Sequence, residues 1–334
     1  MSHGQNWTTS VVSTFKDHPA ICACKHGHSL ITSELPRVHN TCAFASIALA
    51  YPRASRATGQ VIVDLHFLVL AVATRTLTAR PWSVAGYICD ERPPEYLPQL
   101  HARHELVRKL DPSHITYSVL DSGPTIGDYT TVSEALGLDP YPWNPNSPHM
   151  NVSSMIPVIQ DLIHAIKGQD SRTSICVTQI FGWEDYCGDD NGCGKPGVGN
   201  ETEPPAPLKR AMAFAALTLG CRGLLLYSYY DLFETAGRAR ASAPVIAQRL
   251  ADLKALGQEI KTYESAFLGD VADEKLHRIR QPEGVVSGLR CAGSTCTLFL
   301  VNLRDSTQAV HVKASGSAGF KGSLEGYAVH VQQL

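Results

Sequence analysis

The sequence has no apolar run long enough to cross a membrane. The longest one, 61–73, falls short of the about 20 residues that a bilayer helix needs and carries Asp64 and His66, so we interpret it as a buried strand or helix. The first residues also lack the basic start and apolar stretch of a secretory leader. Either the protein is intracellular or this is not the true beginning of the chain, and a membrane partner is not expected.

A strong charge of either sign is absent as well. The 334 residues include 29 basic and 31 acidic side chains, which gives a formal net charge of -2. This balance provides no electrostatic footprint for nucleic acid or for an anionic membrane. No glycine-rich phosphate loop follows any of the expected strands, which counts against a dinucleotide fold, and we assign no cofactor.

The region from Gly86 to about Tyr263 alternates short apolar strands with helices. Strands are expected at 87–89, 115–120, 136–138, 174–180 and 223–227, and helices at 97–110, 155–166, 208–219 and 244–260. Such alternation predicts parallel strands joined by crossovers, and a half-open sheet and a (β/α)8 barrel both fit it. From about Ala266 onward, alternation and hairpin signals predict a small antiparallel β-domain, with strands at 284–289, 297–302, 309–312 and 327–331.

Polar residues gather where the expected parallel strands end. These positions are Asp90-Glu91, Asp121, Asp139-Pro-Tyr, 179–183 and Tyr229-Tyr-Asp. A (β/α)8 barrel builds its active site at the carboxyl ends of its strands, so this placement favours the barrel.

Glu91 is the sharpest candidate among these residues. A carboxyl group held against apolar walls can have its pKa raised enough to act as a general acid, as glycoside cleavage requires. The alternative is that Asp90 and Glu91 only cap the helix that follows. Aromatic faces pack against the C–H faces of sugar rings, so a carbohydrate fits this rim better than a phosphate does. The candidates for substrate binding are Asp90, Gln179 and the aromatic residues Tyr141, Trp143, Trp183, Tyr229 and Tyr230.

The run Gly86-Tyr-Ile-Cys-Asp-Glu-Arg-Pro resembles the strand-four motif, G-x-Y-x-x-D-E-P, of a group of TIM-barrel proteins in the glycoside hydrolase superfamily. The resemblance continues through 138–142, 179–183 and 222–230, and ends in a C-terminal β-sandwich with Leu300-Val-Asn-Leu. It covers roughly 86–334. The resemblance implies an α/β fold, an incomplete (β/α)8 TIM barrel at 86–265 that carries strands four to eight, followed by a β-sandwich at 266–334.

The resemblance also implies roles for individual residues. A Glu at the end of strand four is the acid/base in the related barrels, which corresponds to Glu91. Its neighbour there is usually an Asn that contacts the sugar 2-hydroxyl, and this chain has Asp90. The nucleophile of those barrels is a Glu that ends strand seven, where this chain has Gln179, with Glu184 in the following loop. This departure puts a retaining, covalent mechanism in doubt.

An inverting reaction would require a base across the sugar from Glu91, at roughly 6.5–9.5 Å rather than the ~5 Å of retaining enzymes. Asp139 and Asp231 are the candidates. Each has a structural alternative, because Asp139 precedes Pro140 in a turn and Asp231 is placed to cap a short helix.

The cysteines indicate an oxidising compartment. Two close pairs, Cys187 with Cys193 and Cys291 with Cys296, are each spaced to close a small loop as a disulfide, and neither has a zinc-knuckle spacing. The sequons at Asn151 and Asn200 point the same way, and a secreted parent protein is our preference. Neither the Asp-rich loop at 189–192 nor the histidines at 26, 28, 101 and 104 gives a convincing set of ligands, so no metal is assigned.

Residues 11–21 resemble the helix and turn that lead almost directly into strand four in these barrels. Here that strand arrives only at Gly86, and between Lys25 and Ala85 the only acidic residues are Glu34 and Asp64. We hypothesise that residues 1–22 precede strand four, that 23–85 are an anomalous insert, such as translated intron, and that strands one to three are missing. An insert could cover one of the two exposed sheet edges that such a remnant would have.

Two functions are compatible with these residues. The first is a glycosidase that acts on a carbohydrate with Glu91 as acid/base. The alternative is a non-catalytic or degenerate carbohydrate-binding protein in which Gln179 and the missing strands abolish turnover. A structural or interaction protein is a weaker third. The sugar, the linkage and the oligomeric state are not predicted.

Overall fold

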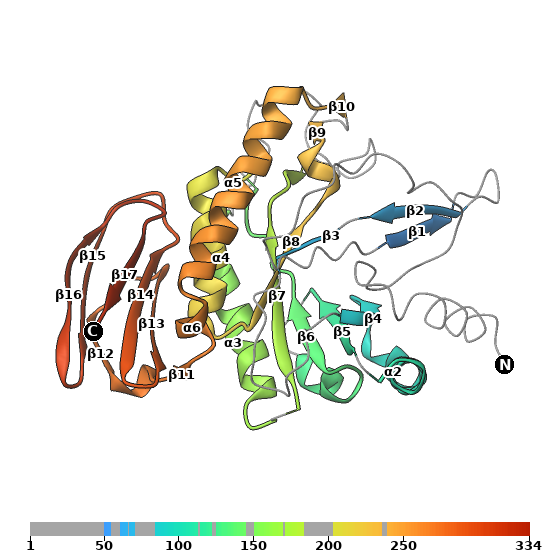
Figure 1. The fold of residues 1–334 in the computed structure, drawn as a ribbon, viewed down its shortest axis with the longest axis horizontal. Coiled ribbons are helices and arrows are strands. Elements are labelled where there is room, and N and C mark those ends of the chain that lie inside the picture. Colours follow the sequence, from blue (N-terminus) through green and yellow to red (C-terminus); the bar gives the residue numbers. More distant parts are fainter. Residues whose placement is uncertain are drawn as a thin grey trace.

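The computed structural model describes residues 50–54, 61–65, 67–70, 84–112, 114–121, 125–144, 150–169, 171–183, 203–235 and 239–334. An α/β unit and an antiparallel β unit lie side by side, with the C-terminus in the β unit (Figure 1). The expected helix before strand four lies outside the described residues. None of the helices in the described ranges has the length and apolarity to span a bilayer.

Five parallel strands form the centre of the α/β unit. They are β4 (Val84–Asp90), β5 (Ile115–Leu120), β6 (Ala135–Leu138), β7 (Thr173–Gln179) and β8 (Gly223–Tyr227). Their order in the sheet follows their order in the chain, and each pairs in parallel with the next. Consecutive parallel strands joined by crossovers are the arrangement of a (β/α)8 barrel, here incomplete, as predicted.

Helices cover one face of this sheet. They are α2 (Leu97–Leu110), α3 (Met155–Ile166), α4 (Ala206–Leu219) and α5 (Ala243–Thr262), followed by the short α6 (Glu264–Phe267). Side chains alternate along a strand, so Leu136, Leu138 and Leu224 point into the main core under the helices. Tyr117 and Val177 face the opposite side, in a smaller apolar cluster with Val119, Ala135 and Leu225.

The β8 edge of the parallel sheet is paired with a strand from the acid-poor region. Here β3 (Phe67–Leu70) runs antiparallel to β8, with Leu68 opposite Leu226. Two further strands of this region, β1 (Ala50–Ala54) and β2 (Val61–Leu65), pair with each other. The described residues of the apolar run 61–73 thus form two strands, β2 and β3, and no helix. The β8 edge of the parallel sheet is covered by β3, in agreement with the expectation that an insert could cover one edge. The origin of 23–85 stays a hypothesis.

The C-terminal unit is the predicted β-sandwich, with two antiparallel sheets around one core. The first sheet contains β11 (Asp270–Val271), β13 (Val285–Ala292), β14 (Thr295–Asn302) and β17 (Val329–Gln333). The second contains β12 (Leu276–Arg280), β15 (Gln308–Ala314) and β16 (Ser317–Leu324). The strands β11, β12 and β16 were not among the sequence predictions. A separate small hairpin, β9 (Glu234–Thr235) with β10 (Ala239–Arg240), precedes α5.

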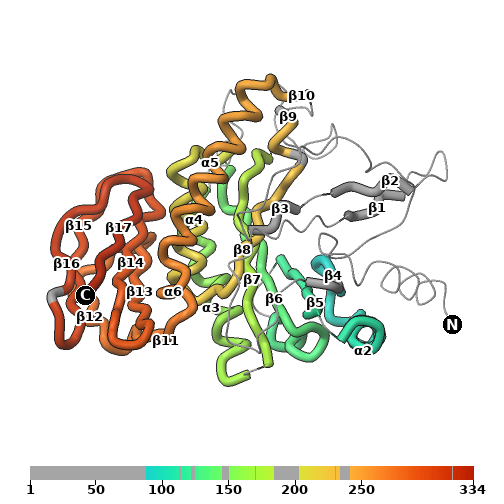
Figure 2. Tube along the Cα trace, viewed as in Figure 1, coloured from blue at the N-terminus to red at the C-terminus, as the bar shows by residue number. Residues whose placement is uncertain are grey.

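The sandwich packs firmly against α4 and α6 (Figure 2). Phe267 of α6 stacks on Phe299 of β14, with ring centroids 4.4 Å apart. Arg290 of β13 is 1% exposed, pairs with Asp273 at 2.9 Å and donates to the backbone carbonyl of Thr218 near the end of α4. These buried contacts join the two units through one continuous core.

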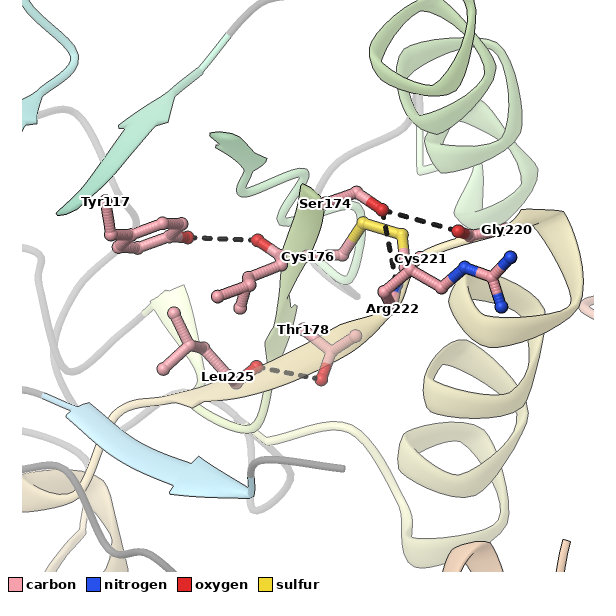
Figure 3. The surroundings of a disulfide bond; sticks show 9 residues. Tyr117, Ser174, Cys176, Thr178, Gly220, Cys221, Arg222 and Leu225 are labelled. Carbon is pink, nitrogen blue, oxygen red and sulfur yellow. Dashed lines mark hydrogen bonds between the residues drawn. A yellow bond between two sulfur atoms is a disulfide. The ribbon is translucent and has the colours of Figure 1, made fainter. Parts of the chain in front are cut away.

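Two disulfides lie in the described part of the chain. Cys291–Cys296 closes the turn between β13 and β14, as predicted. Cys176–Cys221 ties β7 to the residues just before β8, with Cα atoms 6.0 Å apart (Figure 3). The sequence analysis missed this pair because its members are 45 residues apart. The predicted Cys187–Cys193 pair lies outside the described residues.

Candidate active site

Glu91 stands at the carboxyl end of β4, where the chain leaves the sheet. Its φ angle is 48°, in the left-handed region that few residues other than glycine adopt. Its backbone N–H donates to the carbonyl of Val119 on β5 at 3.0 Å, which holds the turn in place. Such a backbone costs about 1–3 kcal/mol and is often found at functional positions. The turn places Glu91 at the rim of the sheet, where the residue as a whole is exposed while its carboxyl group is partly enclosed by neighbouring groups.

Asp139, one residue after β6, is the hydrogen-bonding partner of Glu91. Its side chain is 6% exposed, and burial followed by the neighbouring charge of Glu91 raises its pKa to about 9. The Tyr141 hydroxyl donates to the same carboxyl group, which opposes the increase. The Oδ1 atom of Asp139 is buried and has no hydrogen-bond partner among the described residues. Asp139 is therefore a carboxyl group that keeps its proton at neutral pH.

The pKa of Glu91 is also raised, by burial and by the charges of Asp90 and Asp121, while the hydrogen bond from Asp139 lowers it. Two adjacent carboxyl groups cannot both ionise cheaply, so the pair retains one proton over a wide pH range. Glu91 is the more exposed of the two and carries the negative charge more easily. The proton consequently resides mainly on Asp139.

This contact corrects the role expected of Asp139. A base or nucleophile across a sugar ring from Glu91 would stand at ~5–5.5 Å or at roughly 6.5–9.5 Å, depending on the mechanism. Two carboxyl groups that share a hydrogen bond leave no room for a sugar between them. Asp139 lies beside Glu91 as part of one acidic unit, here called the Glu91–Asp139 pair.

Four rings next to the pair form a group that we call the aromatic cluster: Tyr141, Phe181, Trp183 and Tyr227. Tyr141 and Tyr227 stack with centroids 5.5 Å apart, and Trp183 meets Tyr141 edge-on at 6.3 Å. Tyr141, Trp183 and Tyr227 are half-buried, whereas Phe181 is buried beneath them. Because Tyr141 also bonds Asp139, the cluster and the carboxyl pair are continuous.

Gln179 orders the loop that carries this cluster. Its side chain is 0% exposed. Its Oε1 accepts from the N–H of Trp143 at 2.9 Å, and its Nε2 donates to the carbonyls of Trp143 at 2.9 Å and Phe181 at 3.1 Å. The predicted contact with substrate is not available to a side chain buried in this way. Trp143 is only 8% exposed and packs in the main core. The prediction that its ring packs against a sugar is therefore wrong.

Three further predicted residues follow β8 and are not part of the pair or the cluster. Tyr229 packs on Phe233, with centroids 5.0 Å apart, in an apolar group with Leu253 of α5. Asp231 is 4% exposed, accepts a hydrogen bond from the Ser228 hydroxyl, and its backbone carbonyl binds Arg249 at 2.7 Å. These contacts give Asp231 a structural role, but it lies within the 3-10 helix η5 (Tyr230–Leu232) and is not its N-cap, which the structural alternative expected. The side chain of Tyr230 lies outside the described residues.

A hydrogen bond that crosses β6 holds three strands of the sheet together next to the site. The Tyr117 hydroxyl of β5 donates to the Ile175 carbonyl of β7 at 3.0 Å and so spans β6 (Figure 3). This bond passes over Gly137, where an added Cβ would stand 2.8 Å from Tyr117 Cζ and closer still to the hydroxyl. Only glycine fits here. Because Gly137 lies two residues before Asp139, the crossing fixes the strand that presents the buried carboxyl group.

Phe181 and Tyr227 were missed as site residues, although both lie in motifs quoted from the sequence. The alternation of side chains along a strand would have found Tyr227. It lies two residues after Leu225 and opposite Gln179, on the face that carries Tyr117.

In the described part of the chain, no three His, Cys, Asp or Glu side chains are grouped to hold a metal ion.

Comparison with known proteins gave likenesses of structure only. No family model matches the chain, and no curated protein does. One similar solved structure is the alpha-amylase from Geobacillus thermoleovorans complexed with acarbose, with a TM-score of 0.43 and 10% identity over 72% of this chain and 57% of that one. Another is the ligand-free cyclic alpha-maltosyl-(1→6)-maltose hydrolase from Arthrobacter globiformis, with a TM-score of 0.41 and 8% identity over 71% and 53%.

A third similar structure is the alpha-glucosyl transfer enzyme XgtA, with a TM-score of 0.46 and 13% identity over 72% of this chain and 54% of that one. The chain thus spans little more than half the length of these three proteins. At such TM-scores and identities, the likeness supports no inference about substrate or mechanism.

Proposed function

We propose that the carboxyl-end rim of β4 to β8 binds a carbohydrate and that the Glu91–Asp139 pair supplies the acid for cleavage of a glycosidic bond. The observation that supports this proposal is the continuity of the site: a carboxyl pair that retains a proton is hydrogen-bonded to Tyr141, which belongs to the aromatic cluster. Half-buried rings suit the C–H faces of a sugar, and a retained proton suits its leaving oxygen.

In this proposal Glu91 is the group that touches the substrate. Asp139 first passes its proton to Glu91 through their hydrogen bond, and Glu91 gives it to the glycosidic oxygen as the bond between that oxygen and the anomeric carbon breaks. A water molecule adds to the anomeric carbon, and the proton that it loses restores the protonated pair, so the buried member acts as a proton reservoir. Asp90, whose charge raises the pKa of Glu91, is the neighbour that we assign to a sugar hydroxyl.

A panel of aryl glycosides with leaving groups of different acidity tests this assignment. Glu91→Gln should lower kcat/KM by about 100-fold or more for poor leaving groups such as phenol, since general acid catalysis contributes roughly that much. The loss should be much smaller for a dinitrophenyl leaving group, which departs without a proton. Glu95→Gln is the matched control, because it removes an exposed carboxyl group a few residues beyond β4 and belongs to no part of the site. Equal losses for both leaving groups would contradict the role of Glu91 as an acid.

A non-catalytic carbohydrate-binding function is the second candidate, and Gln179 favours it. The resemblance places a carboxylate nucleophile where this chain has an amide whose three hydrogen bonds are to main-chain atoms. If neither the unsubstituted protein nor Glu91→Gln hydrolyses any glycoside, calorimetric titration with oligosaccharides shows whether the rim binds a carbohydrate. Binding that is weakened by Tyr141→Ala would assign the rim to recognition without turnover.

A further inference from the structure

Asn151 precedes a short 3-10 helix, η3 (Val152–Ser154), that leads into α3, and its position lies outside the proposed carbohydrate site. The run Asn151-Val152-Ser153 is an acceptor sequence for N-linked glycosylation, with no proline in the middle position. We propose that Asn151 is a modification site that carries an N-linked oligosaccharide. A sequon alone would be weak support, since such triplets arise by chance, and the proposal rests on the geometry at this one.

The two ends of the Asn151 amide have different partners. Its Oδ1 accepts hydrogen bonds from the backbone N–H of Ser153 at 3.1 Å and from the Ser153 hydroxyl at 2.5 Å. Its Nδ2 has no hydrogen bond to any of the described residues, and the side chain as a whole is exposed. The nitrogen is thus accessible in the folded protein, and a glycan attached to it displaces no hydrogen bond among the described residues.

The transfer uses a lipid pyrophosphate-linked oligosaccharide as its second substrate. A bond forms between Nδ2 and the anomeric carbon of the first sugar, and the bond from that carbon to the pyrophosphate oxygen breaks. The lipid pyrophosphate leaves with the electron pair, and Nδ2 loses one proton to a base of the transferase. No oxidant or reductant takes part, and the Asn151 carbonyl is unchanged.

The product is compatible with the observed fold. Oδ1 remains an acceptor after Nδ2 is glycosylated, so the cap on η3 is kept. Val152 and Ser153 are buried beside the exposed Asn151, which directs a glycan away from the core. Two disulfides lie in the part of the chain that the structure describes, and Cys176 and Cys221 are almost completely buried. Disulfides form in the oxidising compartments where this modification takes place.

The test is expression of the chain behind a cleavable secretory leader in a eukaryotic cell. Asn6→Asp and Asn200→Asp together form the background, so that Asn151-Val-Ser is the one N-x-Ser/Thr acceptor sequence that remains. We expect an intact mass higher by one oligosaccharide, removal of that mass by an amidase specific for N-glycans, and conversion of the modified asparagine to aspartate. Both the secreted protein and the pool within the cell are measured, because transfer precedes folding and a retained chain still reports occupancy.

Three variants identify the site. Asn151→Asp keeps the capping oxygen and removes the nucleophilic nitrogen, so it should lack the added mass while retaining the cap. Ser153→Ala should lack it also, whereas Ser153→Thr keeps a hydroxyl and should be modified. An unmodified mass for the background protein, which lacks Asn6 and Asn200, in both pools would overturn the proposal, and so would an oligosaccharide that persists when Asn151→Asp is added to that background.

Discussion

Replacing Asp139 with asparagine should make the protein more stable, and increasingly so as the pH rises. The folded-state pKa of Asp139, about 9, lies far above its ordinary value of 3.8. The protein must therefore take up a proton at this carboxyl group whenever it folds between these two pH values. The asparagine of the variant would need no proton. It has nearly the same shape, and its amide N–H replaces the carboxyl O–H as the donor to Glu91.

The size of the effect follows from proton linkage. A group with a raised folded-state pKa contributes stability that is complete below its unfolded value and is lost as the pH rises towards its folded value. The penalty grows by about 1.4 kcal/mol for each pH unit, so at pH 7 it reaches about 4 kcal/mol relative to acidic solution. Since a whole domain is stable by only about 5–15 kcal/mol, this is a large share.

Urea unfolding of the parent protein and of Asp139→Asn at pH 4, 6 and 8 measures the effect. We expect nearly equal free energies of unfolding at pH 4 and a difference of a few kcal/mol in favour of the variant at pH 8. Asp161→Asn, at an exposed position of α3, controls for the loss of one carboxyl group. A difference between the parent protein and Asp139→Asn that does not change with pH would refute the conclusion that Asp139 is buried as a neutral acid.

Three other substitutions test the framework of the site by urea unfolding. Gly137→Ala would force a methyl group into the hydrogen bond between a tyrosine and the neighbouring strand, and it should destabilise the protein by about 3 kcal/mol or more; a neutral effect would show that the strands can separate there. Gln179→Leu leaves three buried main-chain groups unpaired and should cost about 2–4 kcal/mol, with a red-shifted tryptophan emission if the loop moves and exposes Trp143. The double variant Cys176→Ala and Cys221→Ala opens a loop of 45 residues and should lose about 4 kcal/mol, and no loss under oxidising conditions would contradict the bond.

The strands and helices of the barrel region could be predicted closely because their apolar spacing is regular. The expected helices 97–110 and 155–166 and the strands 115–120 and 223–227 have the same bounds in the structure. The omitted strands are those whose pattern is weak. In the sandwich, β16 contains two glycines and a lysine, and β12 is largely exposed, so neither shows the alternation of a half-buried strand.

The carboxyl pair could be anticipated only in part. Position at a strand end predicted that Glu91 and Asp139 share a rim, and the structure brings them into contact. The distance between them depends on how the chain turns after β4. The sequence contains no signal that predicts the left-handed backbone of Glu91. A model that placed both carboxyl groups across a sugar from each other was therefore as consistent with the sequence as one that placed them side by side.

Several polar and aromatic residues at this rim are buried, which explains why residue type alone did not predict which of them could contact a sugar. Gln179, Trp143 and Asp231 each have a side chain that could meet a sugar, but each is less than about a tenth exposed and is used inside the protein. A buried polar group must be satisfied by the fold itself, so strand ends recruit such residues to hold loops as well as to bind ligands. At this rim Gly137 fixes the strand and Gln179 fixes the loop. Glu91 and the half-buried rings of the aromatic cluster are the groups that remain accessible to solvent. The residues that shape the site and those proposed to act in it are thus interleaved along the same strands.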